Sequence, residues 1–443
     1  MHLIFENLLP NLIKHWTGEF KGLDEGSEAY RFLPHIWEAI GKATAAAGGT
    51  MPSAYGARVP NIEQDRANMS AEMWSLWLLY IGPVVLRRRF LHQKYYDHFV
   101  ELVRLVQICL QFEITHDEIC DVRAGFQKWV VDYEKIYYQH NPERVSACPL
   151  TIHALLHIAD SIEYMGPVWC YWAFPMERYC GNLQPALKSR RYPYASLDRY
   201  VVERAQMEQI NAIYNVAPEM SLRPPHRKIP RGGYAPIAYP TCILLPPRVA
   251  GPIESPALTA IVVALATRFN MRVQEVRPHV RNADIVQYGR VRRVDTDEGD
   301  TIRAADLVAS REDSRDADYV RYELYVDRNK RSKRKKVELE LETFYGQLRR
   351  IYVVRFRDPH AIAAFDLGNE PEIVLASIRS CPVTETHNVL DIHYYENQGE
   401  LDTVDITSIQ ALVGRVRDID RWAIVDRSGT LARAVFDSSR DSN

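Results

Sequence analysis

The chain has 443 residues, of which 47% are hydrophobic and 25% charged, and its formal net charge is −2. The length predicts two to three domains with cores of their own, and the composition is that of an ordinary soluble protein. The near-zero charge excludes a uniformly basic nucleic-acid binder, so such contacts must come from local patches. Seven cysteines without framework spacing favour a reducing compartment. No apolar run approaches the roughly 20 residues that span a membrane.

Residues 1–147 are predicted to form an all-helical array. Apolar residues recur at helical spacing within 3–16, 33–40, 73–78, 99–110 and 119–137. Ser70 and Thr115 stand where they can cap two of these helices. Gly48 and Gly49 are expected to end the helix that begins near Tyr30. The polar segment 48–68 is interpreted as a surface connector.

Residues 148–217 hold the side chains that suggest chemistry. His153 and His157 are four positions apart, so a helix places both imidazoles on one face. This geometry suits two ligands of one zinc ion, although a tetrahedral zinc site needs four ligands. The alternative is a helix in which both imidazoles are hydrogen-bonded and bind no metal. A zinc protease needs Glu directly after the first histidine. That position is Ala154, which excludes this class.

Charged groups follow the histidines. Beyond a Gly-Pro break and an aromatic run, Glu177 and Arg178 form a lone acidic-basic pair. Glu177 also fits the role of an acid that favours a helix start. Two basic clusters, at 87–89 and at Lys188, Arg190 and Arg191, are candidate phosphate contacts, with ordinary surface charge as the alternative.

Together these features resemble a known family. The pattern resembles the C-terminal catalytic segment of the transposases of CACTA (En/Spm) elements, the Tnp2-like family, in its fungal form. The resemblance is carried by the following residues: His153, His157, Gly166, Pro167, the block Trp172–Tyr179, the cluster Lys188–Arg191, Pro193 and Ser196. The opening residues Met1–Leu8 and the segment Gly56–Pro60 also resemble the family. The match covers roughly the first half of the chain.

The resemblance implies an RNase H-like nuclease in which two Asp and one Glu surround two divalent metal ions such as Mg²⁺. Glu177 is the residue that corresponds to this Glu. His153 and His157 correspond to half of a zinc site that a Cys-x-x-Cys completes, an arrangement similar to the V(D)J-recombinase core. Residues 1–147 correspond to a helical insertion in that fold. Two hard cations need shared carboxylates to activate a water or a 3′-hydroxyl.

The chain departs from this family in one respect. In the family, both Asp residues and the Cys-x-x-Cys are expected upstream of the matched segment, and the seven cysteines here include no Cys-x-x-Cys. Because one carboxylate cannot hold two catalytic metals, we expect the chain to be catalytically incomplete by itself. DNA, a second copy and an upstream transposase fragment are its candidate partners.

The second half has a different character. Ten prolines within 218–256 predict an extended linker. A short apolar helix is expected at 257–268. Alternating segments at 288–294 and 337–342, with further strands at 351–356, 372–379, 389–395, 409–416 and 420–426, predict a small all-β barrel or sandwich over 257–443. The whole chain is therefore predicted to be an α+β multidomain protein.

A basic run lies between two of these strands. Within the nine residues Arg328–Lys336, seven are basic and none is acidic. The candidate phosphate contacts in it are Lys330, Arg331, Lys333, Arg334, Lys335 and Lys336. Such a run is typical of a nuclear-localisation signal or a phosphate-binding patch, and a solvated hairpin tip is the alternative. The signal predicts a nuclear protein.

Three functions are compatible with the sequence. The first is a remnant of a CACTA-type transposase that lacks part of its active site. The second is an exapted protein that binds nucleic acid without cutting it. The third is an unrelated hydrolase that combines Glu177 with other carboxylates of this chain. The absence of a Cys-x-x-Cys and of matching Asp contexts favours the first over the third.

Overall fold

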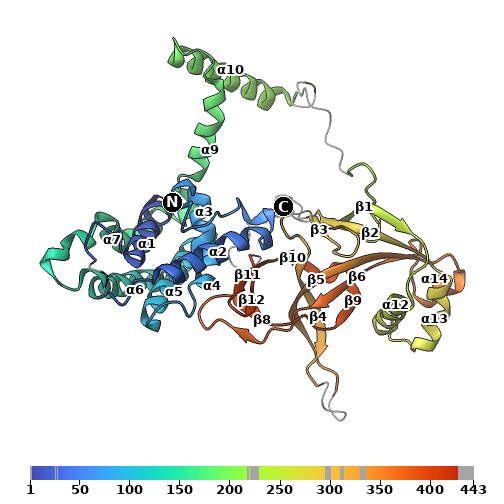
Figure 1. Ribbon diagram of the computed structural model, residues 1–443. Helices are drawn as coiled ribbons and strands as arrows, with labels where there is room; N and C mark the ends of the chain where they lie inside the picture. Colours follow the sequence, from blue (N-terminus) through green and yellow to red (C-terminus); the bar gives the residue numbers. More distant parts are fainter. Residues whose placement is uncertain are drawn as a thin grey trace.

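The chain folds into a helical half and a β-rich half (Figure 1). The computed structural model describes residues 2–24, 26, 28–216, 219, 229–294, 301–309, 314–329 and 336–427. This confirms the mixed α+β class and the predominantly helical first half. Within these ranges, no helix has the length and apolar character needed to cross a membrane.

Helices of three kinds build the first half. The α-helices are α1 (Leu9–Thr17), α2 (Pro34–Thr50), α3 (Ala71–Leu76), α4 (Gly82–Val85), α5 (Gln93–Cys109), α6 (His116–Tyr133), α7 (Leu150–Ala154), α8 (Ile158–Met165), α9 (Phe174–Leu183) and α10 (Pro193–Tyr214). The π-helices are η1 (His2–Leu8), η4 (Trp77–Ile81) and η5 (Glu134–Tyr138). The 3₁₀-helices are η2 (Ser53–Tyr55), η3 (Arg66–Asn68), η6 (Pro142–Ala147), η7 (Leu155–His157), η8 (Val168–Cys170) and η9 (Gln184–Ala186).

The predicted helix starts are confirmed, and one predicted helix end is wrong. The Ser70 hydroxyl accepts a hydrogen bond from the Met73 amide, and Thr115 forms a capping box with Glu118. Helix α2 runs through Gly48 and Gly49 and ends at Thr50. Gly48 makes room for a side chain, because a Cβ there would lie 2.6 Å from the Cγ of Arg58.

The second half consists of antiparallel strands and a few helices. Its elements are β1 (Cys242–Ala250), α12 (Ser255–Arg268), α13 (Val273–Arg281), β2 (Asp284–Arg293), β3 (Thr301–Arg303), β4 (Tyr319–Asp327), β5 (Leu339–Arg355), α14 (Pro359–Ala364), β6 (Glu372–Ser380), β7 (Glu385–Thr386), β8 (Ile392–Tyr395), β9 (Leu401–Asp405), η10 (Ile406–Ser408), β10 (Ile409–Leu412), β11 (Gly414–Asp418) and β12 (Arg421–Val425). The large sheet has the order β1-β2-β5-β4-β10, with β3 beside β2 and β6-β9 on the other side of β5. The small sheet has the order β11-β12-β8-β7.

The large sheet is not a closed barrel, so that part of the sequence prediction is wrong. Strand β5 pairs with β4 and β2 along one edge and with β6 along the other. Helices α12, α13 and α14 cover one face, against which Tyr352 and Val354 pack, while Ile351 and Val353 enter the core on the opposite face. Alternating hydrophobicity identifies strands, but it does not specify whether a sheet closes.

Strand β1 lies inside the stretch that proline content predicts to be an extended linker. It pairs with β2 over residues 242–245 and 248–250, and the register shifts between Leu245 and Arg248. Pro246 and Pro247 occupy this shift. Because the pairing is interrupted there, their missing amide donors leave the rest of the ladder intact.

The small sheet forms a layer between the helical half and the large sheet. Ile392, Tyr394, Ala423 and Val425 belong to the core of the helical half. Tyr395, Val413 and Ile424 pack instead with Tyr319 and Tyr345 of the large sheet. Because successive residues of a strand point to opposite faces, one short sheet contributes to both cores.

Hydrogen bonds near residues 50–56 tie the two halves together. The Tyr55 hydroxyl donates to the Val425 carbonyl at 2.8 Å and accepts from the Arg427 amide at 3.1 Å. The Arg315 Nε donates to the Met51 carbonyl at 2.6 Å. Part of the segment interpreted from sequence as a surface connector is therefore a contact between the halves.

A buried histidine makes the stability of the protein depend on pH. His98 stacks on Trp129 with 4.3 Å between ring centroids, and its Nε2 lies 3.2 Å from the Trp129 carbonyl. Burial lowers the pKa of His98 from 6.5 to about 4, although the Trp129 carbonyl and the nearby Asp132 and Glu101 carboxylates oppose this shift. Between these two pH values the unfolded chain binds more protons than the folded one.

We therefore expect the free energy of unfolding to fall as pH decreases from 6.5 towards 4, by about 3 kcal/mol from His98. Urea unfolding at several pH values measures this change. In His98→Phe the ring stack remains but the titrating group is absent, so the decrease should be shallower. It should not vanish, because burial also lowers the pKa of His15, to about 3. An identical pH dependence in both proteins would contradict this assignment.

Candidate functional site

His153 and His157 face each other, as their spacing predicts. His153 is in α7 and His157 ends the 3₁₀-helix η7, and both side chains are exposed. Their Nε2 atoms lie 3.2 Å apart. Two nitrogen ligands of one tetrahedral zinc ion, each about 2.0–2.1 Å from the metal, lie about 3.3 Å apart. The same separation is that of a hydrogen bond between the two rings, so it fits both alternatives, two satisfied imidazoles and two ligands of one zinc ion.

Further ligands do not join this pair within the described part of the chain. There, no group of three or more His, Cys, Asp or Glu side chains is arranged to hold a metal ion. Cys148, Cys170 and Cys180 are free thiols on the same half of the molecule. The two histidines would thus fill two of the four positions of a zinc site.

Glu177 lies in the first turn of α9 and contacts a histidine. Its Oε1 is 3.0 Å from the Nε2 of His2 in η1, and its side chain is 48% exposed. Sequence reasoning missed His2, because nothing in the pattern relates residue 2 to residue 177. Over the described ranges Glu177 belongs to no group of three or more His, Cys, Asp or Glu side chains that could hold a metal ion.

Helices α9 and α10, with η9 between them, form an arm that stands away from the helical half (Figure 1). No side chain of α9 or α10 is buried. Ion pairs between residues four positions apart stabilise α10. Arg199 Nε lies 2.7 Å from Glu203 Oε1, and Arg204 Nε lies 2.8 Å from Glu208 Oε1. Arg178 is exposed on α9. The side chains of these two helices are therefore accessible rather than packed into the core.

Residues 188–194, which comprise the turn after η9 and the first two residues of α10, are called the elbow. Lys188, Arg190 and Arg191 are exposed in it. Tyr192 and Tyr194 are 59% and 87% exposed. Among the described ion pairs, none involves these three cations. The elbow thus brings three cations next to two accessible aromatic rings.

Hydrogen bonds between nearby residues stabilise the conformation of the elbow. The Lys188 amide donates to the Ser196 hydroxyl at 3.2 Å, and that hydroxyl lies 3.3 Å from the Ala186 carbonyl. The Tyr192 amide donates to the Ser189 hydroxyl at 3.0 Å. Pro193 is the first residue of α10, a position where its missing amide donor costs nothing.

Arg87 is not the free phosphate contact that its cluster suggests. Its side chain is 15% exposed, and its Nη2 lies 2.5 Å from Glu385 Oε1 in the β-rich half. Its guanidinium lies 4.6 Å from the centroid of the Tyr394 ring. Arg421 pairs with the same carboxylate at 2.5 Å. Arg87 therefore connects the two halves through Glu385, a residue that lies nearly 300 positions later in the sequence.

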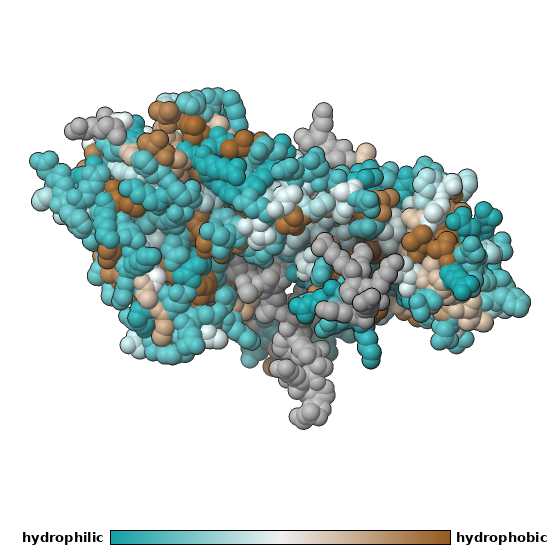
Figure 2. All heavy atoms as spheres, turned by 90° about the horizontal axis from the view of Figure 1, so that it is seen from below, coloured by the Kyte–Doolittle hydropathy of each residue, from teal (hydrophilic) through white to brown (hydrophobic). Residues whose placement is uncertain are grey.

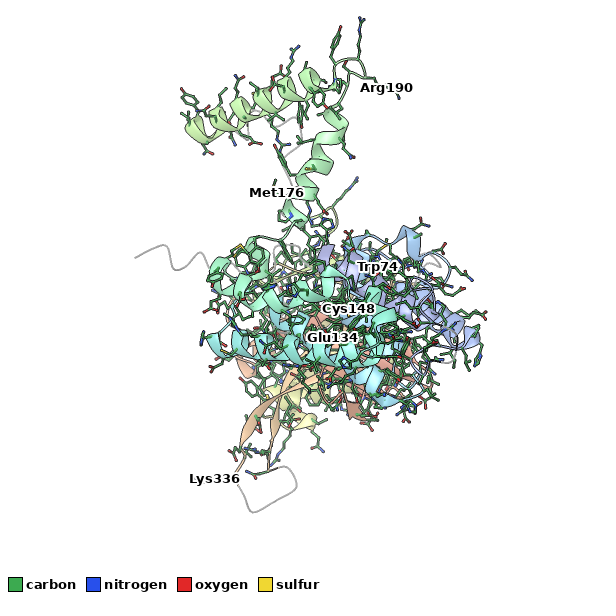
Figure 3. All side chains as sticks on the ribbon, turned by 90° about the vertical axis from the view of Figure 1, so that its left-hand side faces the viewer. Trp74, Glu134, Cys148, Met176, Arg190 and Lys336 are labelled. Carbon is green, nitrogen blue, oxygen red and sulfur yellow. The ribbon has the colours of Figure 1, made fainter. Side chains whose placement is uncertain are left out.

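The basic run begins at the end of a projecting β-ribbon formed by β4 and β5 (Figure 1). The Arg328 amide donates to the Glu338 carbonyl at 2.9 Å, and the Asn329 side chain donates to the Lys336 carbonyl at 2.8 Å. Five predicted phosphate contacts lie outside the described residues: Lys330, Arg331, Lys333, Arg334 and Lys335. Lys336 and the elbow residue Arg190 lie at opposite ends of the molecule (Figure 3).

Figure 2 shows one face of the molecule, on which hydrophilic residues predominate and hydrophobic residues form small separate patches. A large apolar docking area is therefore not a feature of this face.

Comparisons of the chain with protein-family models, with curated proteins and with solved structures find no match.

Proposed function

We propose that this chain is a transposase-derived protein that binds nucleic acid and does not cut or join DNA strands by itself. The proposal rests on the elbow, where Lys188, Arg190 and Arg191 are exposed next to Tyr192 and Tyr194. Cations that follow a phosphate backbone, combined with aromatic rings on which bases stack, are the usual means of binding single strands.

The proposed origin of the chain, a transposase, rests on its resemblance to CACTA-type transposases. The helical half would then correspond to the insertion and the C-terminal part of an RNase H-like core, with Glu177 as its Glu. The partners would be DNA and a second copy of the chain, and an upstream transposase fragment would supply the missing Asp residues and Cys-x-x-Cys. The basic run at 328–336 would direct the protein to the nucleus.

The elbow gives the direct test of binding. Replacing Tyr192 and Tyr194 by alanine removes two stacking surfaces, and each is expected to contribute about 1–3 kcal/mol of single-strand affinity. Fluorescence anisotropy with a labelled single-stranded oligonucleotide should show a large loss of affinity with an unchanged salt slope, because no charge is altered.

The matched control is Tyr164→Ala, which removes a tyrosine that is 84% exposed in α8, outside the elbow. The control should bind like the wild type. Equal affinity of the elbow variant and the wild type would show that the elbow is not a nucleic-acid surface.

The same proposal predicts the absence of strand cleavage. A single carboxylate at Glu177 cannot hold the two metal ions that activate the nucleophile and stabilise the leaving oxygen. Purified protein with Mg²⁺ or Mn²⁺ should therefore leave supercoiled and linear DNA intact. Metal-dependent cleavage that disappears in Glu177→Gln would overturn this prediction, and cleavage that persists in that variant would indicate a contaminating nuclease.

A further inference from the structure

A cleft of about 900 Å³ lies between the two halves of the protein. Its walls are formed by α5, α6 and η5 on one side and by the turn between β7 and β8 on the other. The stacked rings of His98 and Trp129 border it. Clefts of this size are typical of sites for small molecules.

The turn that forms the second wall is held in place. The Nδ1 of His387 accepts hydrogen bonds from the Val389 and Leu390 amides, both at 3.1 Å. Its Nε2 must then carry the proton, and it lies 3.2 Å from the Tyr96 hydroxyl of α5. The Tyr96 hydroxyl donates to the Pro83 carbonyl at 2.6 Å. The two walls are therefore connected, and the cleft is formed before any ligand enters.

Every carboxylate that lines the cleft already has a partner in the protein. The pairs are Asp97 with Gln93 at 2.9 Å, Glu101 with Arg104 at 2.8 Å, Asp132 with Lys135 at 3.0 Å, and Glu385 with Arg87 at 2.5 Å. The partners of Glu101, Asp132 and Glu385 are cations, so three of these four negative charges are compensated within the protein, whereas the Gln93 amide is neutral and leaves the charge of Asp97 in place.

Three cations of the walls are not compensated in this way. Over the described ranges, Arg88, Lys94 and Lys128 have no carboxylate within ion-pair distance, and all three are exposed. Arg88 also has a φ of 57°, a left-handed conformation that costs a non-glycine residue free energy and that is common at ligand sites. Three cations without an ion-pair partner, against the single uncompensated carboxylate of Asp97, favour an anion with more than one negative charge.

We propose that this cleft binds a small phosphorylated compound with two or more phosphate groups. Lys94 and Lys128 extend from α5 and α6, and Arg88 from the segment after α4, so the cations come from three separate elements. Arg and Lys are the side chains that usually hold phosphate oxygens. This site is independent of the elbow, which belongs to the arm.

Inorganic pyrophosphate is the probe for this proposal. Isothermal titration calorimetry of the full chain at constant ionic strength should show saturable binding. The double variant Lys94→Gln/Lys128→Gln should weaken it about tenfold or more, because two of the three uncompensated charges are removed. The control Lys14→Gln/Arg281→Gln removes the same charge from exposed positions in α1 and α13, outside the cleft and the elbow, and should leave pyrophosphate binding unchanged.

Two results would overturn the proposal. One is no saturable binding up to about 10 mM pyrophosphate, and the other is an equal loss of binding in both double variants. Far-UV circular dichroism of each variant shows whether it is folded. A single-stranded oligonucleotide that displaces pyrophosphate would identify nucleic-acid phosphates as the source of the ligand groups, and failure to displace it would identify a free compound.

Discussion

Replacing Tyr394 by alanine is expected to lower the free energy of unfolding by about 3–5 kcal/mol, the usual cost of removing a large buried aromatic side chain. Tyr394 is 0% exposed and belongs to the core that the small sheet shares with the helical half. Two guanidinium groups contact its ring, that of Arg87 at 4.6 Å and that of Arg421 at 4.1 Å from the ring centroid. The substitution leaves a cavity and deprives both cations of the ring face.

Urea unfolding followed by far-UV circular dichroism measures this effect. Because the small sheet contributes to the cores of both halves, we expect helix and sheet signals to disappear in one transition, at lower urea in the variant. The matched control is Tyr394→Phe, which keeps the ring and should cost about 1 kcal/mol or less. Loss of the β signal alone, with the helical half still folded, would show that the halves are stable independently.

Neutralising the basic run at 328–336 is expected to reduce the salt dependence of duplex DNA binding more than neutralising the elbow does. Each phosphate contact contributes about 0.9 to the slope of log affinity against log salt. Replacing Lys333, Arg334, Lys335 and Lys336 by glutamine should therefore reduce the slope by up to about 3–4. The motivation is the density of charge, seven basic residues among nine without an acid.

The elbow provides the control for this experiment. Replacing Lys188, Arg190 and Arg191 by glutamine removes three charges at the opposite end of the molecule (Figure 3) and should reduce the duplex slope less. If the run variant binds duplex DNA like the wild type while the elbow variant loses binding, the arm is the main contact surface and this prediction is wrong.

Local structure was predictable from the sequence where residues close together in the chain determine it. Ser70 and Thr115 cap helices because each cap involves residues within three positions. The alternation over residues 288–294 identified β2. His153 and His157 face each other because α7 and η7 follow each other directly, so residues four positions apart lie on the same side of this helical segment.

Contacts between distant segments were not predictable in this way. Strand β1 contains two prolines, so its composition alone predicts a linker. It forms a strand because it pairs with β2, a contact that composition does not reveal. The ion pair of Arg87 with Glu385 and the contact of Glu177 with His2 leave no signal in local spacing. The cleft likewise combines residues 87–136 with residues 385–389.

A titration of the full chain with labelled single-stranded and duplex DNA, in Mg²⁺ and over a range of salt, tests the central proposal most directly. We expect binding that weakens as salt rises, with the DNA recovered intact. Absence of binding even at low salt would contradict nucleic-acid binding, and cleavage that depends on Glu177 would contradict the claim that the chain is catalytically incomplete.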